Sequence, residues 1–191
     1  NPVPLNIPIG DGQTYKGIVD LIEMKSIIYE EDDGTNYETV DIADDIKAQA
    51  DKWREHLLEE VASSDESLME KYLDGEEINV IELKNAIRNA CVNGDIVPML
   101  CGSAFKNKGV QSLLDAVIDF LPSPLDVGSI DGFDVDDKEK ELHREPNNDA
   151  PFSALAFKIM TDPFVGRLTF FRVYSGSVST GDFIYNPTSA K

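Results

Sequence analysis

The stretch Ile96-Val-Pro-Met-Leu-Cys101, followed by Gly102-Ser-Ala-Phe-Lys-Asn-Lys-Gly109, decides how the chain is interpreted. Its first part is a short continuous apolar run, which is typical of a buried strand. Beyond the loop, apolar residues recur at the spacing of one helix face, namely Val110, Leu113, Leu114, Val117, Ile118 and Leu121. Pro122-Ser-Pro124 ends this helix. A strand, a loop and a helix in this order predict the last unit of an α/β domain.

Upstream of this unit, strand signals give way to helix signals. Residues 1–42 alternate apolar and polar positions between turn residues, which predicts several short strands. The segment begins without a methionine and inside a strand pattern, so we expect the chain to be a piece of a longer protein. From Ile46 the period becomes helical, with one apolar stripe formed by Ile46, Ala50, Trp53, Leu57 and Val61.

Two capping-box patterns divide the helical region. Asn79 with Glu82 predicts the start of a helix that runs through Cys91, and Asn93-Gly94 predicts its end. Ser63 with Glu66 has the same spacing. Either a new helix begins there, or one helix bends.

Downstream of the helix that ends near Leu121, the composition changes twice. Residues 123–150 hold prolines and aspartates without any period, which predicts a linker. Residues 151–191 show alternating runs separated by glycine-containing turns, which predicts the start of an all-β domain.

Charge limits the partners that the chain can bind. The net charge is −19 over 191 residues, and the acidic residues concentrate in 30–77 and 131–149. Such a surface repels nucleic-acid backbones as a whole and favours either solubility or a basic protein partner. Residues 151–191 differ, because Asp162 and Asp182 are their only acidic residues. We therefore expect at least two functional regions.

The sequence lacks the motifs of most enzymes, and we assign no catalytic and no metal-binding residue. It contains no G-x-G-x-x-G, no G-K-[ST] and no D-x-x-G, so no loop for phosphate groups can be proposed. Asn107-Lys-Gly-Val110 resembles the guanine-reading N-K-x-D motif, but Val110 stands where the aspartate is needed. His56 and His143 are interpreted as solvated, and Cys91 and Cys101 as buried free thiols. No apolar run approaches a membrane span, so a cytoplasmic location is expected.

One loop remains as a candidate site. The turn Gly102-Ser-Ala-Phe105 follows the predicted strand and precedes the predicted helix. Small residues in such a turn expose backbone N–H groups, which can donate to a carbonyl oxygen or an anion. The alternative is an ordinary strand-to-helix turn.

Long runs of the sequence resemble bacterial translation elongation factor G. Leu100 to Gln111 and Leu114 to Pro124 are similar to the end of its GTPase domain. Phe152 to Ile159 and Asp162 to Gly176 are similar to the opening of its second domain. Asn1-Pro-Val-Pro4, Pro8-Ile-Gly10 and Leu68-Met-Glu-Lys-Tyr-Leu73 are similar to the insert called G′. The resemblance covers essentially the whole chain.

The resemblance implies an α+β fold with four parts. Residues 1–95 correspond to the mixed insert, 96–122 to the last strand and helix of the GTPase domain, 123–150 to a linker, and 151–191 to the start of a β-barrel. The parent factor uses GTP and Mg²⁺ to drive tRNA and mRNA through the ribosome. Its phosphate loop, switches and N-K-x-D motif lie outside this segment, so we expect the segment alone to be inactive and to hold no cofactor.

The resemblance also implies the roles of particular residues. A Ser-Ala loop in such factors gives backbone donors to guanine O6, and Ser103 and Ala104 match it, with Phe105 alongside. The second domain leans on small-subunit ribosomal RNA. An acidic helix of the insert meets the large-subunit stalk protein, which implies contacts from acidic residues that face away from the apolar stripe if one helix continues: Glu55, Glu59, Glu66 and Glu70. Ser63 stands where another acid is expected, so that contact is lost or moved to Glu60.

Two other interpretations remain open at this stage. The chain could be a stand-alone acidic binding module, or part of another translational GTPase, such as a ribosomal protection protein or a release factor. We also expect the strand and helix of 96–121 to lack packing partners in this segment. Self-association through Val97, Met99, Leu113 and Val117 is therefore expected.

Overall fold

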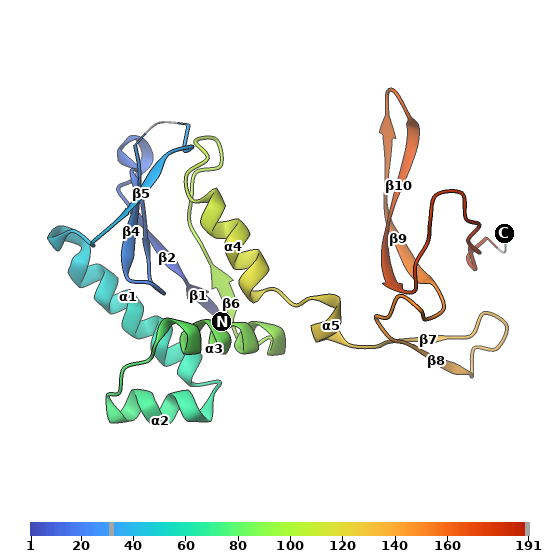
Figure 1. Cartoon of the computed structure of the whole chain (residues 1–191), viewed down its shortest axis with the longest axis horizontal. Coiled ribbons are helices and arrows are strands. Elements are labelled where there is room, and N and C mark those ends of the chain that lie inside the picture. Colours follow the sequence, from blue (N-terminus) through green and yellow to red (C-terminus); the bar gives the residue numbers. More distant parts are fainter. Residues whose placement is uncertain (31–32, 190–191) are drawn as a thin grey trace. The chain divides into compact units, whose positions relative to one another are not determined.

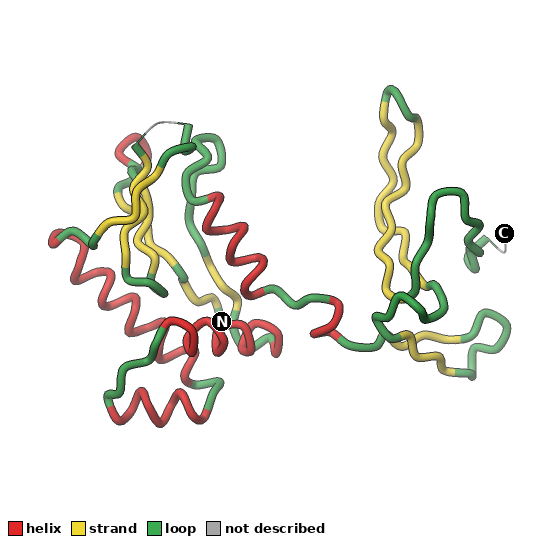
Figure 2. Tube along the Cα trace, viewed as in Figure 1, coloured by secondary structure: helices red, strands yellow, loops and turns green. Residues whose placement is uncertain are grey.

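The computed structural model describes residues 1–30 and 33–189. The chain divides into two compact units, Asn1–Leu121 and Pro122–Lys191. Helices and mostly antiparallel sheets occur together, so the fold is α+β (Figures 1 and 2). Among the described residues, no helix is long and apolar enough to cross a membrane.

A four-stranded antiparallel sheet forms one part of the first unit. Its strands follow one another in chain order and are β2 (Asn6–Ile9), β3 (Gly17–Asp20), β4 (Lys25–Tyr29) and β5 (Tyr37–Val40). A 3-10 turn, η1 (Gly12–Thr14), connects the first two of them. Ile7 and Val19 are buried, and their backbones are paired in register. The strand signals of 1–42 are confirmed.

A second, parallel pair joins the start of the chain to the strand that precedes the candidate loop. It consists of β1 (Pro2–Pro4) and β6 (Val97–Met99). The Leu5 amide extends this pairing by donating to the Met99 carbonyl oxygen at 2.9 Å. The loop is therefore tied to the sheet through the backbone that leads into β2.

The helices pack around these strands (Figure 1). They are α1 (Asp44–Ala62), α2 (Glu66–Asp74), α3 (Val80–Asn93) and α4 (Val110–Phe120). Helix α1 contacts α2, α3 and β1, and α3 contacts α4. Ala50, Leu57 and Val61 are buried on α1, while Ile46 and Trp53 are partly buried against the same core. This confirms the predicted apolar stripe.

The helix boundaries confirm one capping box and correct the other. Asn79 accepts a hydrogen bond from the Glu82 amide, and Gly94 ends α3 in a left-handed conformation, as predicted. Ser63, by contrast, ends α1, and its hydroxyl donates to the Glu60 carbonyl oxygen at 2.7 Å. Asp65 caps the next helix instead, accepting from the Leu68 amide at 3.0 Å. The chain thus forms two helices here.

The expected burial of the strand 96–101 is only partly correct. Ile96 is buried, but the side chains of Val97 and Met99 are 60% and 49% exposed. On the neighbouring helix, Leu113 and Val117 are 47% and 44% exposed. In the described part of the chain, β6 pairs with a single strand, which leaves these side chains uncovered.

The second unit corrects the expectation of a linker over 123–150. This segment forms a short helix, α5 (Pro124–Val127), and a hairpin of β7 (Ile130–Phe133) and β8 (Glu141–Arg144). Asp134 and Lys140 close the hairpin through a backbone hydrogen bond of 3.0 Å and an ion pair of 2.8 Å. Most of the strand residues are exposed, so no apolar alternation marks them in the sequence.

A longer hairpin follows, made of β9 (Ser153–Asp162) and β10 (Gly166–Ser175). Asp162 Oδ1 accepts from the amides of Phe164 and Val165 at 2.8 and 2.9 Å, and this fixes the turn. The strand signals of 151–175 are therefore confirmed. Beyond Ser175, the described residues 176–189 form no strand, and the last two residues of the expected 151–191 domain lie outside the described part.

Candidate functional site

The loop between β6 and α4 is closed by its own backbone. The Ser103 amide donates to the Lys108 carbonyl oxygen at 2.7 Å, and the Lys108 amide donates back to Ser103 at 3.1 Å. Inside this pair, the Asn107 amide donates to the Ala104 carbonyl oxygen at 3.1 Å, and Asn107 adopts a positive φ of 50°. The tip of the loop is thus a tight turn, Ala104 to Asn107. The backbone pairing of Ser103 with Lys108 closes this turn.

Glycines at both ends let the two strands of the loop approach closely. A Cβ atom on Gly102 would lie 2.8 Å from the Lys108 carbonyl oxygen. Gly109 has a φ of +83°, and a Cβ atom there would lie 3.0 Å from both Cys101 O and the Gly102 Cα atom. Side chains at these positions would force the loop open.

The donors at the tip differ from those that the resemblance implies. Because the Ser103 amide is already paired with Lys108, it cannot also donate to a ligand in this conformation. The amides of Ala104 and Phe105 donate no hydrogen bond to any described residue. The Phe105 side chain is 106% exposed, so it contributes nothing to the core. The loop therefore offers neighbouring backbone donors at Ala104 and Phe105.

The lookalike of the N-K-x-D motif belongs to the same loop. Asn107 lies at the positive-φ position of the turn, and Lys108 forms the bridge and is buried. Val110 begins α4. Asn107 and Lys108 thus have a structural role in the loop, and Val110 provides no carboxylate for a guanine base.

The four acidic residues expected to meet a partner lie on two helices. Glu55 and Glu59 are on α1, and Glu66 and Glu70 are on α2. All four are exposed, and the two pairs are separated by the break between α1 and α2, where Asp65 caps α2. The assumption of one continuous helix is therefore wrong. Glu60, the alternative contact, already has a partner within the chain, since its carboxylate accepts a hydrogen bond from the Asn1 side chain at 2.7 Å.

A shallow hollow of about 510 Å³ lies beside the acidic residues of α1. Its lining consists of Lys52, Trp53, Glu55, His56 and Glu59. The rings of Trp53 and His56 meet edge to face, with centroids 5.7 Å apart. The Tyr72 hydroxyl of α2 donates to Glu59 at 3.2 Å. Sequence reasoning did not single out Trp53 or Tyr72 as part of this surface.

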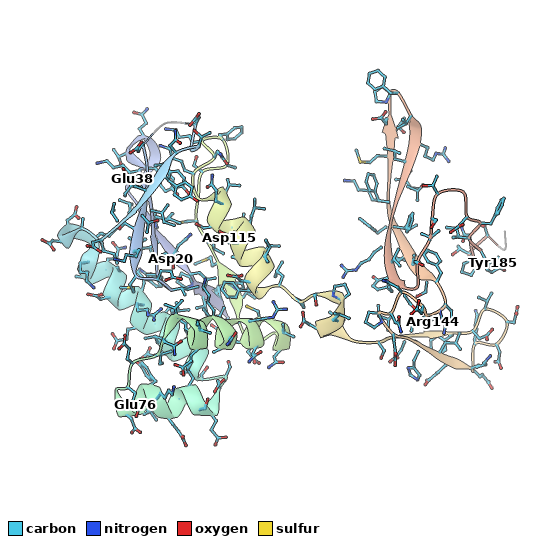
Figure 3. The ribbon with its side chains drawn as sticks, in the orientation of Figure 1. Asp20, Glu38, Glu76, Asp115, Arg144 and Tyr185 are labelled. Atoms are coloured by element: carbon cyan, nitrogen blue, oxygen red, sulfur yellow. The ribbon has the colours of Figure 1, made fainter. Side chains whose placement is uncertain are left out.

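A smaller hollow of about 140 Å³ lies between the sheet and α4, and both Asp20 and Asp115 line it (Figure 3). Asp20 Oδ1 accepts from the amides of Ile22 and Glu23 at 2.7 and 3.0 Å, while burial raises the pKa of this carboxyl. Lys84 of α3 lies 3.6 Å from Glu23 and 3.7 Å from Asp119. Lys84 thus links α3 to the turn after β3 and to α4. Among the described residues, no group of three or more acidic, histidine or cysteine side chains could hold a metal ion.

The β9–β10 hairpin carries three basic residues and a single acidic one, Asp162. Lys158, Arg167 and Arg172 are exposed on it. The guanidinium of Arg172 lies 5.7 Å from the centre of the Tyr174 ring. Basic groups beside aromatic rings are suited to contact with RNA, although no base-reading geometry follows from them.

Comparison with known proteins gives a structural likeness without a family. No protein-family model matches the chain. Among solved structures, the chain is similar to a protein of Thermus thermophilus, with a TM-score of 0.70 and 27% sequence identity. The match covers 95% of this chain and 24% of the Thermus chain. The likeness therefore includes both units, and it lies within a much longer protein.

Proposed function

We propose that this chain is an internal part of a translational GTPase of the elongation factor G type. The observation that carries the proposal is the loop Gly102–Gly109, whose tip presents the free amides of Ala104 and Phe105 between β6 and α4. This is the place where the resemblance puts the contact with guanine O6. Since the Ser103 amide is paired with Lys108, we assign the contact to Ala104, with Phe105 next to it.

In the longer protein, hydrolysis of GTP, with Mg²⁺ as its cofactor, would supply the energy for movement of tRNA and mRNA through the ribosome. The residues of this chain bind and orient the base, because the loop offers donors for a carbonyl oxygen. No phosphate-binding motif occurs in the sequence. The chain alone is therefore expected to hydrolyse no GTP.

Two further surfaces belong to the proposal. The exposed residues Glu55, Glu59, Glu66 and Glu70 would meet the basic domain of the large-subunit stalk protein. The basic hairpin β9–β10 would meet small-subunit ribosomal RNA, and the protein would act in the cytoplasm. The match to only 24% of the Thermus chain supports the view that this segment belongs to a longer protein.

The test is GTP hydrolysis by the longer protein that carries this segment, measured with and without ribosomes. We expect hydrolysis that ribosomes stimulate strongly. No stimulation, together with tight stalk binding by the 191-residue chain alone, would favour the acidic binding module instead. Stimulated hydrolysis without translocation of tRNA and mRNA would favour another translational GTPase.

A further inference from the structure

The candidate loop is held by Tyr29, a residue of the four-stranded sheet that is far from the loop in the sequence but in contact with it. The Tyr29 hydroxyl, at the end of β4, accepts a hydrogen bond from the Gly109 amide at 2.8 Å. The same hydroxyl donates to Gln111 Oε1 in the first turn of α4 at 3.1 Å. Tyr29 is only 5% exposed; its hydrogen bond with the Gly109 amide is buried, and the one with Gln111 is partly buried. One side chain thus fixes the point where the loop becomes the helix.

The segment after β4 supports the same loop from another side. Gln111 Nε2 donates to the Gly34 carbonyl oxygen at 3.2 Å. Gly34 lies so close to the loop that a Cβ atom would be 2.4 Å from the carbonyl oxygens of both Lys106 and Asn107. Gly34 therefore lies directly against the backbone of the loop tip.

The beginning of the loop is fixed by β2. The Cys101 amide donates to the Asn6 side chain at 2.8 Å. Tyr15 is close as well, since its hydroxyl lies 3.6 Å from the position of a Cβ atom on Gly109. Burial, with smaller contributions from Cys101 and Tyr29, raises the pKa of Tyr15 to about 12, so this phenol stays neutral beside the loop. The loop is consequently anchored at both ends and in its middle by Asn6, Tyr29 and Gly34.

We infer that Tyr29 is a positioning residue for guanine recognition: by holding the Gly109 amide and Gln111, it sets the place of the Ala104 and Phe105 donors. The inference rests on the proposed function. Donors that are already fixed lose little conformational freedom when a ligand binds, which increases affinity. Tyr29 touches no ligand itself and acts only through the loop.

The test uses the longer protein with Tyr29→Phe, which removes the hydroxyl and keeps the ring. The affinities for GDP and for 2-aminopurine riboside 5′-diphosphate, which lacks O6, are measured by competition. We expect GDP affinity to fall roughly three- to tenfold, as for the loss of about one hydrogen bond. The affinity for the nucleotide without O6 and kcat at saturating GTP stay unchanged.

Tyr37→Phe is the matched control. Tyr37 is paired with Tyr29 in the register of β4 and β5, and its ring is 5.6 Å away, but its hydroxyl makes no hydrogen bond with the described residues. We expect this variant to bind GDP as the unaltered protein does. Gln111→Leu gives a second variant, with a smaller loss of GDP affinity, in case Tyr29→Phe unfolds.

Two outcomes overturn the inference while leaving the proposed function intact. One is unchanged GDP affinity in Tyr29→Phe although hydrogen exchange at the Gly109 amide accelerates. The other is an equal loss of affinity for both nucleotides, which means a general disturbance of the fold. If the unaltered longer protein binds no guanine nucleotide, the proposed function fails, and the inference fails with it.

Discussion

The hydroxyl of Tyr29 lies 2.8 Å from the Gly109 amide nitrogen and joins residues that are 80 positions apart in the chain. The four-stranded sheet and the loop before α4 therefore form one structural element. The local sequence around Gly102–Gly109 therefore contains only part of the information that fixes the loop. This relationship makes the stability of the loop depend on residues of the sheet, which mutations can test.

Gly34→Ala should destabilise the first unit. The new Cβ atom would lie 2.4 Å from two backbone carbonyl oxygens, at a φ of +65°. We expect a cost of about 1–2 kcal/mol from the left-handed backbone and about 1–3 kcal/mol from the steric overlap. The measurement is urea unfolding followed by the fluorescence of Trp53, the single tryptophan.

Gly75→Ala is the control for this variant. Gly75 has a similar φ of +70°, but apart from its chain neighbours no described residue has an atom within 4 Å of its hypothetical Cβ atom. Only the backbone cost should remain. Equal destabilisation by the two variants would show that Gly34 does not press on the loop.

The 191-residue chain alone should bind no GDP that calorimetry can detect. The free amides of Ala104 and Phe105 provide about 1 kcal/mol each, whereas even millimolar affinity requires about 4 kcal/mol. Titration of the chain with GDP and with GTP checks this. Micromolar binding by the chain alone would contradict the assignment of the phosphate contacts to other parts of the longer protein.

Glu59→Lys combined with Glu66→Lys should slow association with the stalk protein. Both side chains are exposed, so each pair with a basic partner is worth about 0.2–1 kcal/mol and is screened by salt. Stopped-flow association with the longer protein at low and high salt measures the effect, which should shrink as salt rises. The double variant Glu38→Lys with Glu139→Lys is the control, because it makes the same change of charge at exposed positions outside α1 and α2. An unaltered rate at low salt in the first double variant would refute the assignment.

Asp65→Ala should destabilise the first unit by about 0.5–2 kcal/mol, because it removes the cap of α2. A hydrogen bond from the Leu68 amide, and to a smaller extent one from the Ser67 side chain, holds the pKa of the Asp65 carboxyl below its usual value. The carboxylate therefore contributes stability above the pKa of the unfolded chain, about 3.9, and this contribution is lost as pH falls through the folded-state pKa.

Asp65→Asn distinguishes the contribution of the Asp65 charge to stability from that of its capping hydrogen bond. It keeps an oxygen that can accept from Leu68 but does not titrate. At pH 7 this variant should lie between the unaltered protein and Asp65→Ala in its free energy of unfolding. Its difference from the unaltered protein should vanish at pH values below the folded-state pKa. A difference that stays constant with pH would show that the carboxylate charge has no role.

The isolated chain should associate with itself through β6 and α4. Val97 and Met99 on the strand and Leu113 and Val117 on the helix are all more than 40% exposed, at 60%, 49%, 47% and 44%. Val117→Asp should weaken association by placing a charge in the contact. Sedimentation at increasing concentration measures this, with Ile81→Asp as a control at a position of α3 that is 72% exposed. A concentration-independent monomer would refute the prediction.

Local chemistry made much of the first unit predictable from the sequence. Asn79, Glu82 and Gly94 determine the ends of α3 through neighbouring backbone groups, so their pattern is sufficient. Ser63 was misassigned because Asp65 competes for the same role, and Asp65 Oδ1 also accepts from the Ser67 hydroxyl at 2.8 Å. Two capping residues so close together cannot be ranked from sequence spacing alone.

Properties that depend on distant residues were not predictable. The apolar run around Val97 indicates a buried strand by itself, and its exposure was expected only because the resemblance implied that neighbouring strands are missing from this segment. The free amide at Ala104 follows from the Ser103–Lys108 bridge, which no motif marks. The roles of Tyr29 and Gly34 at the loop follow from tertiary contacts alone.

The order of these parts along the chain has one more consequence. Asn6, Tyr29 and Gly34, which support the loop, all precede α1, and the loop itself follows α3. Helices α1 and α2, which carry the exposed acidic residues, thus lie in the sequence between the residues that support the loop and the loop itself. Changes in the length or surface of α2 can therefore accumulate during evolution without altering the loop, so that the exposed surface of the helices and the geometry of the loop can diverge independently.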